Sequence, residues 1–176
     1  MCAAASPAHR RARLSRVALV SALFAELCFA APPAPRSIVN ARAPQIARAD
    51  LNGAPINLRN LRGKVVLLNF WATWCAPCLV EMPVFNTWQQ KYGPQGFQII
   101  GISMDDDAAP VRKLVVRLKP TYPIAMGDAK LGAQYGGVMG LPLTYLIDRH
   151  GIVRARFQGE ADISTIEKQL KSMLEK

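Results

Sequence analysis

Two cysteines separated by two residues, Cys75 and Cys78, constrain this chain more than any other feature. They follow an apolar run, residues 65–71, which is interrupted only by Asn69 and has the length of a buried strand. Pro77 favours the first turn of a helix, because the amide hydrogen that proline lacks would have no intrahelical partner there. The sequence therefore predicts two thiols at a strand-to-helix junction.

The expected helix favours the thiolate form of Cys75, because a helix N-terminus carries partial positive charge and free amide hydrogens. A thiol with the ordinary pKa of about 8.5 is roughly 3% ionised at pH 7, whereas a pKa of about 7 leaves roughly half of it ionised. That change needs about 2 kcal/mol, the upper end of what a helix terminus supplies. We therefore expect a reactive pair.

Half of a zinc site and a purely structural disulfide are the alternatives for this pair. The other two cysteines, Cys2 and Cys28, both lie in the N-terminal segment, and His9 and His150 do not form a matching second pair of ligands. A tetrahedral zinc site wants four Cys or His ligands. Redox chemistry is favoured, and no metal site is expected.

The N-terminus has the pattern of an export signal. Four arginines between residues 10 and 16 precede the mainly apolar stretch 17–30, whose 14 residues fall short of the roughly 20 that span a membrane. We therefore expect a signal peptide over residues 1–30, in preference to a membrane anchor. Residues 31–43 are rich in Ala and Pro and are expected to be a linker, and residues 44–176 one folded domain.

Positive charge is spread along the chain. The formal net charge is +10, and 18 basic against 11 acidic residues, or +7, remain without residues 1–30. The densest basic cluster lies within one expected helix: Arg112, Lys113, Arg117 and Lys119. A solvated helix face explains it better than nucleic-acid binding, because no aromatic residues are interleaved. Attraction to acidic partners or transient association with membrane surfaces is a weaker alternative.

Strands and helices are expected to alternate after residue 44. Asn52-Gly53 between two short extended segments suggests an initial hairpin. The expected strands are 45–49, 56–58, 64–71, 97–103, 122–125, 143–147 and 152–157, and the expected helices are 77–92, one opened by Pro110, 129–135 and one along 163–174. The acidic residues 105–107 are expected to complement a helix N-terminus rather than bind metal. This order predicts a mixed sheet covered on both faces, a three-layer α/β/α sandwich.

Four passages resemble the thioredoxin superfamily, and within it the exported TlpA, ResA and CcmG-like thiol-disulfide oxidoreductases. They are Leu61 to Val66, Asn69 to Cys78, Glu81-Met82-Pro83 and Gly140 to Asp148. The resemblance covers about residues 44–176 and implies a thioredoxin-like fold with an inserted strand-helix unit between Cys78 and Pro142.

The resemblance also implies roles for individual residues. Cys75 would be the attacking thiol and Cys78 the resolving thiol. Pro142 would be a cis-proline beside the disulfide, where the backbone of Leu141 contacts substrate. Glu81 matches an acidic residue that tunes the thiols in ResA-like proteins, although a carboxylate favoured by the helix dipole is its ordinary explanation.

Three further residues complete the expected substrate-binding surface. Ala76 and Pro77 lie between the cysteines, and Trp74 would form a partly exposed wall of the substrate groove, with core packing as its alternative. Asn69 stands where ordinary thioredoxins carry a buried aspartate, which leaves proton transfer to Glu81 or water.

The implied function is periplasmic or otherwise extracytoplasmic disulfide reduction by a monomer. Substrates would be disulfide-bearing exported proteins such as apocytochrome c, the electron donor a membrane thiol reductant of the DsbD or CcdA type, and the redox group the cysteine pair itself, with no other cofactor. The direction of electron flow stays open, because dithiol potentials range from about −270 to −120 mV and Ala76-Pro77 does not fix a value.

A dithiol oxidant, a thiol peroxidase and a Sco-like copper metallochaperone are the alternatives. A peroxidase would use one peroxide-reactive cysteine rather than an adjacent dithiol. Copper-binding relatives separate their cysteines by three residues and add a histidine ligand, whereas His150 is expected to lie in a turn.

Overall fold

The computed structural model describes residues 37–175, so the signal peptide predicted for residues 1–30 lies outside the described part. The strands are β1 (Ala47–Ala49), β2 (Pro55–Asn57), β3 (Val65–Trp71), β4 (Phe97–Ser103), β5 (Ile124–Met126), β6 (Leu143–Ile147) and β7 (Val153–Gln158). The helices are α1 (Ala76–Tyr92), α2 (Ala108–Leu118), α3 (Ala129–Gln134) and α4 (Ile163–Leu174), with short 3₁₀ turns at Leu58–Leu61 and Gly93–Gln95.

A five-stranded mixed sheet forms the centre, in the order β5-β4-β3-β6-β7. β3, β4 and β5 run parallel, whereas β6 is antiparallel to β3 and β7 is antiparallel to β6. β1 and β2 form the predicted antiparallel hairpin as a separate two-stranded sheet. The β5-α3 unit between α2 and β6 is the predicted insertion, and it adds a strand at one edge of the sheet.

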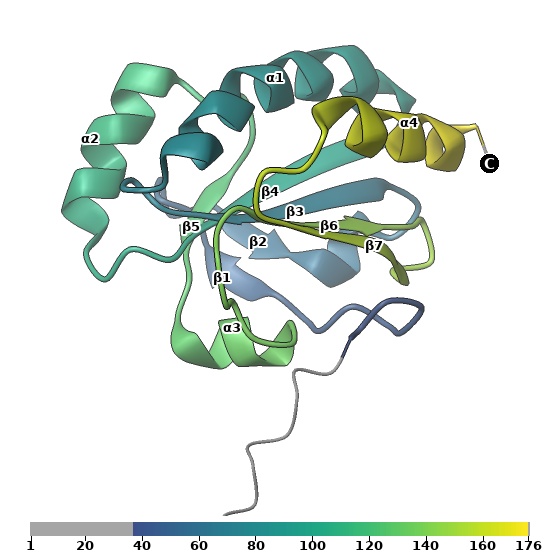
Figure 1. The fold of residues 1–176 in the computed structure, drawn as a ribbon, viewed down its shortest axis with the longest axis horizontal. Coiled ribbons are helices and arrows are strands. Elements are labelled where there is room, and N and C mark those ends of the chain that lie inside the picture. Colours follow the sequence, from purple (N-terminus) through teal and green to yellow (C-terminus); the bar gives the residue numbers. More distant parts are fainter. Residues whose placement is uncertain (1–36, 176) are drawn as a thin grey trace, which may run out of the picture. The chain divides into compact units, whose positions relative to one another are not determined.

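Apolar residues cover both faces of the sheet and make two cores. One core joins β3 to Phe85 of α1, Leu114 of α2 and Ile166 of α4. The other joins β3 to the hairpin residue Ile56 and to Leu131 of α3. Figure 1 shows α1, α2 and α4 on one side of the sheet, and α3 with the hairpin on the other. The predicted three-layer α/β/α arrangement is confirmed.

The folded part begins before Pro44, within residues that the sequence assigned to a linker. The backbone N–H of Asn40 donates to the carbonyl of Val153 at 2.7 Å, and that of Ala43 donates to the carbonyl of Gly151 at 2.9 Å. Ala43 is also buried. These bonds hold residues 40–43 against the β6-β7 turn and the first residue of β7, and the composition of the segment does not predict them.

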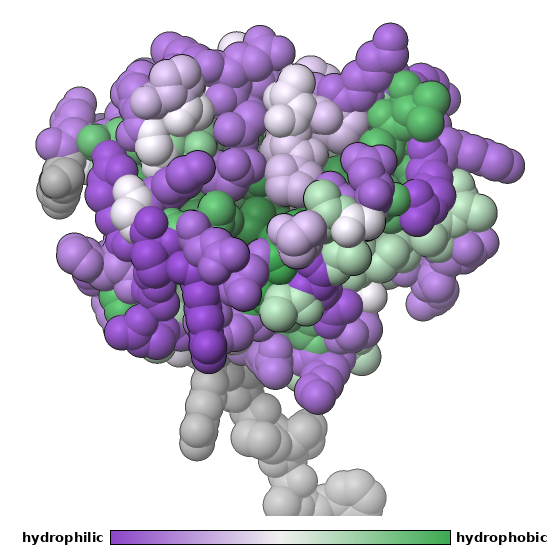
Figure 2. Space-filling model, turned by 180° about the vertical axis from the view of Figure 1, so that it is seen from behind, coloured by the Kyte–Doolittle hydropathy of each residue, from purple (hydrophilic) through white to green (hydrophobic). Residues whose placement is uncertain are grey.

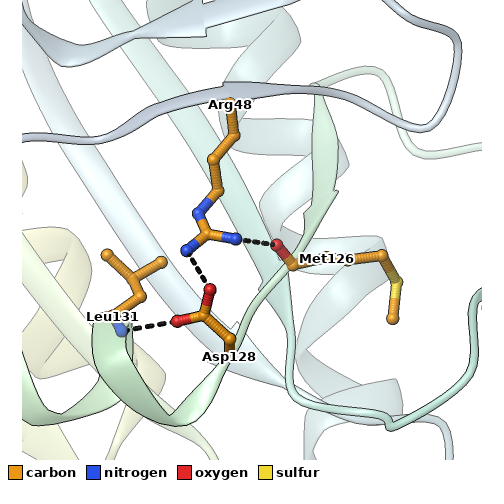
Figure 3. Close-up of polar contacts among 4 residues, drawn as sticks. All are labelled: Arg48, Met126, Asp128 and Leu131. Carbon is orange, nitrogen blue, oxygen red and sulfur yellow. Dashed lines mark hydrogen bonds and ion pairs between the residues drawn. The ribbon is translucent and has the colours of Figure 1, made fainter.

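Arg48 connects the hairpin to the insertion (Figure 3). Its guanidinium donates to the carbonyl of Met126 at 3.1 Å and to the carboxylate of Asp128 at 2.6 Å. Asp128 also accepts the backbone N–H of Leu131 at 2.7 Å and so caps α3. One half-exposed ion pair therefore joins β1, β5 and α3.

Hydrophilic side chains cover most of the face seen in Figure 2, and hydrophobic ones reach it in smaller patches. Within residues 37–175, none of the helices has both the length and the hydrophobicity needed to cross a membrane.

Candidate active site

The active-site loop leaves the C-terminal end of β3 and leads directly into α1. Cys75 is the N-cap of this helix, and Pro77 is in its first turn, as predicted. The sulfur of Cys75 accepts the backbone N–H of Cys78 at 3.3 Å. The helix N-terminus thus directs an amide hydrogen at Cys75, which is the environment that favours a thiolate.

Cys75 and Cys78 form a disulfide, with their Cα atoms 5.3 Å apart. Cys75 is 4% exposed and Cys78 1% exposed, and both belong to the core between the sheet and α1. The slightly more exposed cysteine is therefore also the one at the helix N-terminus. Its position suits Cys75 to meet a substrate first.

Glu81 lies one turn beyond Cys78 on α1 and is only 6% exposed. Burial, and to a smaller extent the negative charge of Glu160, raises the pKa of Glu81 to about 7. Its Oε2 has no hydrogen-bond partner among the described residues. A buried carboxyl group that titrates near neutral pH can accept or donate a proton beside the cysteine pair.

Tyr122 and Trp71 supply two more buried polar atoms, in the core that contains both cysteines. The Tyr122 hydroxyl and the Trp71 Nε1 have no hydrogen-bond partner within residues 37–175. Both side chains approach Gly101, where a Cβ would meet Trp71 Nε1 at 3.2 Å and the Tyr122 ring at 3.4 Å. Burial, followed by the charge of Glu81, raises the pKa of Tyr122, so this residue stays a neutral phenol. Neither side chain supplies a cation to lower the pKa of Glu81.

The Leu141-Pro142 peptide bond is cis, as the resemblance implied. It precedes β6, in which Leu143 is paired with Phe70 of β3. This register places Pro142 beside the end of β3, from which the loop to Cys75 departs. Pro142 is buried, and Leu141 is half-buried and packs against the core that contains both cysteines.

The surface around the disulfide is formed in part by the remaining predicted substrate-binding residues. Trp74 is 70% exposed, so the alternative of core packing is wrong. Ala76 is exposed and Pro77 is half-buried. Their roles in substrate binding stay predictions.

Asp105 is a site residue that the sequence reasoning missed. Its Oδ2 accepts the backbone N–H of Thr73 at 2.9 Å and the hydroxyl of Ser103 at 2.7 Å. Its Oδ1 accepts the Thr73 hydroxyl. The pairing of Trp71 with Ser103 explains this contact, because two residues beyond each partner lie Thr73 and Asp105. The sequence did contain a signal for this contact: two strands expected to be neighbours and parallel are each followed by a polar residue.

Asp107 and His150 agree with their ordinary explanations. Asp107 caps α2 by accepting the backbone N–H of Ala109 at 3.0 Å, as was expected of one member of the acidic run. His150 lies in the exposed turn between β6 and β7. No group of three or more His, Cys, Asp or Glu side chains in the described part of the chain is placed to hold a metal ion.

Three features define the class of this protein: a mixed sheet, a helix capped by one cysteine of a Cys-x-x-Cys disulfide, and a cis-proline beside the end of the strand that leads to this disulfide. They are the features of a thioredoxin-fold thiol-disulfide oxidoreductase. The Redoxin family model matches residues 38–171, and the chain belongs to this family. Its relatives place it among the TlpA/ResA-like proteins of the thioredoxin superfamily.

The relatives include the thiol-disulfide oxidoreductase ResA of Bacillus thuringiensis subsp. konkukian, which is 35% identical over 77% of this chain and 78% of its own length. ResA of Geobacillus kaustophilus is 36% identical over 77% of this chain and 78% of its own length. Among solved structures, a Chlorobium tepidum protein assigned to the DsbE thiol:disulfide interchange proteins has a TM-score of 0.74 and 30% identity, covering 79% of this chain and 99% of its own. A secreted thiol-disulfide isomerase from Corynebacterium glutamicum has a TM-score of 0.68 and 26% identity, covering 76% and 86%.

Proposed function

We propose that this protein reduces disulfide bonds in proteins that lie outside the cytoplasm. Apocytochrome c and other exported proteins with cysteine pairs are such substrates. The observation that carries the proposal is the position of Glu81, a buried carboxyl group with a pKa of about 7, one helical turn from Cys78. A dithiol that attacks a disulfide must release the proton of its second thiol, and we propose that Glu81 takes it.

The reaction starts from the reduced pair. The Cys75 thiolate attacks one sulfur of the substrate disulfide, forms a mixed disulfide and releases the other sulfur as a thiolate. Cys78 then transfers its proton to Glu81 and attacks the Cys75 sulfur. The second substrate sulfur leaves, so the substrate gains two electrons and the protein is left with the Cys75-Cys78 disulfide. No bound cofactor is needed for these steps.

The resulting disulfide must be reduced again, because compartments outside the cytoplasm are oxidising. A membrane dithiol reductant of the DsbD or CcdA type would supply the two electrons. Two features support the location: the basic and apolar residues at the N-terminus, and the likeness to a secreted isomerase. We propose that the protein acts as a monomer and contacts the membrane transiently.

Covalent trapping tests the exchange mechanism. Cys78→Ser removes the resolving thiol, so substrates should stay attached to Cys75 and be released by dithiothreitol. Cys75→Ser is the matched control and should trap nothing. Absence of trapped proteins in cells that express the Cys78→Ser variant would contradict the mechanism.

The midpoint potential of the pair, measured against glutathione, decides the direction. A value near −120 mV would show an oxidant, whereas a reductase needs a value toward −270 mV or below. Peroxide consumption that survives Cys78→Ser would show a peroxidase, and stoichiometric copper retention without disulfide reduction would show a metallochaperone.

A further inference from the structure

A groove lies between α2 and the residues that flank the two cysteines in the chain. Thr73 and Leu79 line one side of it, and α2 supplies the other with Pro110, Lys113, Leu114 and Arg117. Figure 1 shows α2 alongside the N-terminal half of α1.

Hydrogen bonds connect the residues on the α1 side of the groove to the active-site loop. The backbone N–H of Leu79 donates to the carbonyl of Cys75 at 3.3 Å. Thr73 precedes Cys75 by two residues, and Asp105 fixes it through both its backbone and its hydroxyl. A chain in this groove would therefore lie within reach of the sulfur that we propose attacks substrate.

The wall on the α2 side carries two cations on one helix face. Pro110, Lys113, Leu114 and Arg117 follow the spacing i, i+3, i+4 and i+7, so they form one stripe. Lys113 and Arg117 are exposed and form no salt bridge with residues 37–175. Like charges at this spacing repel each other in an isolated helix.

Asp105, Asp106 and Asp107 lie just before α2, and none of them forms a salt bridge with Lys113 or Arg117. Asp105 is engaged by Thr73 and Ser103, and Asp107 caps α2. The groove thus combines the apolar side chains of Leu79 and Leu114 with two cations that form no salt bridge within the described part of the chain. An extended polypeptide that carries Asp or Glu close to its disulfide fits this combination.

We infer that the α1-α2 groove binds the substrate chain next to its disulfide and selects substrates with acidic residues there. This inference rests on the proposed reductase function and adds its substrate class. The cations accelerate encounter with a negative chain and hold it while Cys75 attacks.

Two peptides, each with one internal disulfide and identical except for Asp or Lys beside the attacked cysteine, provide the test. The rate of reduction of each peptide by the reduced protein is measured at low salt. The wild type should reduce the Asp peptide about tenfold faster than the Lys peptide, and added salt should diminish this ratio. The double variant Lys113→Glu/Arg117→Glu should invert the preference.

Lys130→Glu/Lys168→Glu is the matched control, because it changes the net charge equally at exposed lysines of α3 and α4. It should keep the wild-type ratio. Lys113→Gln/Arg117→Gln removes charge while retaining most of each side chain, and should bring the ratio near one even if the reversal variant folds poorly.

An unchanged peptide ratio in the Gln variant would overturn the inference. Loss of binding to vesicles of anionic phospholipid in that variant, together with an unchanged ratio, would assign the cations to a membrane surface instead. Reduction of the neutral bis(2-hydroxyethyl) disulfide tests the proposed function separately: it should be equal in all variants, and its absence in the wild type would refute the reductase rather than the groove.

Discussion

Both carboxylate oxygens of Asp105 accept hydrogen bonds from Thr73, one from its backbone N–H at 2.9 Å and one from its hydroxyl at 2.5 Å. The contact connects the loop after β4 to the segment that leads from β3 to Cys75. A carboxylate that accepts several donors holds a loop more firmly than one bond does. The position of the nucleophile therefore depends on a residue thirty positions away in the chain.

Asp105→Ala should weaken both the fold and the reaction. Loss of the acceptor leaves the part-buried N–H of Thr73 without its partner, and we expect the free energy of unfolding to fall by about 2 kcal/mol. Alkylation of Cys75 in the reduced protein should slow as its loop loses order. Asp105→Asn retains an acceptor oxygen, so its stability and its alkylation rate should lie between those of the wild type and Asp105→Ala. Urea unfolding of the oxidised protein and iodoacetamide kinetics of the reduced protein measure these effects, and an unaltered Asp105→Ala protein would contradict the assigned role.

Glu81 should make the oxidised protein less stable as pH rises. Its pKa is about 7 in the folded protein and 4.5 in the ordinary carboxyl, so the folded state binds the proton more tightly between these values. The stabilisation is complete below about pH 4.5 and is lost as pH rises through 7. The shift corresponds to roughly 3 kcal/mol.

Glu81→Gln should remove this pH dependence, because its amide does not titrate. The difference in free energy of unfolding between the two oxidised proteins is measured by urea unfolding at pH 4.5, 6 and 8. A difference that stays constant over this range would show that Glu81 does not titrate there.

Thr144→Val should cost about 1 to 2 kcal/mol of unfolding free energy. The Nδ2 of Asn69 donates to the Thr144 hydroxyl at 3.0 Å, and both residues are buried between β3 and β6. Valine preserves the shape but leaves the amide without this acceptor. Thr144→Ser keeps the hydroxyl and serves as control. Equal urea midpoints for Thr144→Val and the wild type would show that Asn69 finds another partner.

Arg48→Ala should loosen the insertion more than the rest of the fold. The ion pair with Asp128 is half exposed and contributes little by itself, but the bond to the Met126 carbonyl is lost as well. We expect a loss of about 1 kcal/mol. Hydrogen exchange should accelerate in α3 while that of β3 is unchanged, and Arg48→Lys should restore part of the protection. Equally accelerated hydrogen exchange in α3 and throughout the sheet would show that Arg48 does not stabilise the insertion locally.

The sequence contained enough information to predict the strand-to-helix junction. The apolar run before Cys75 has no polar residue except Asn69, and Pro77 occupies a first-turn position, so periodicity and local backbone chemistry agree. The closing helix and the last two strands were also predicted within a residue or two, because their apolar residues recur at clear spacing.

Tertiary contacts explain what the sequence could not predict. Ala43 and its neighbours have the composition of a linker, yet the amides of Asn40 and Ala43 donate to carbonyls of the β6-β7 turn and of the first residue of β7. The strand expected at residues 122–125 begins at Ile124, because the pairing with β4 starts where Ile124 meets Gly101. Spacing placed Glu81 on the helix face of Cys78, but the rise in its pKa depends on burial against elements distant in sequence.

The buried carboxyl near the disulfide also makes electron transfer depend on proton activity. For a two-electron couple, each proton taken up with the electron pair contributes about 30 mV per pH unit to the midpoint potential. Because Glu81 titrates at about pH 7, any change in its affinity for a proton on reduction bends the plot of potential against pH in the neutral range. The reducing power of the Cys75-Cys78 pair would then follow the acidity of its compartment.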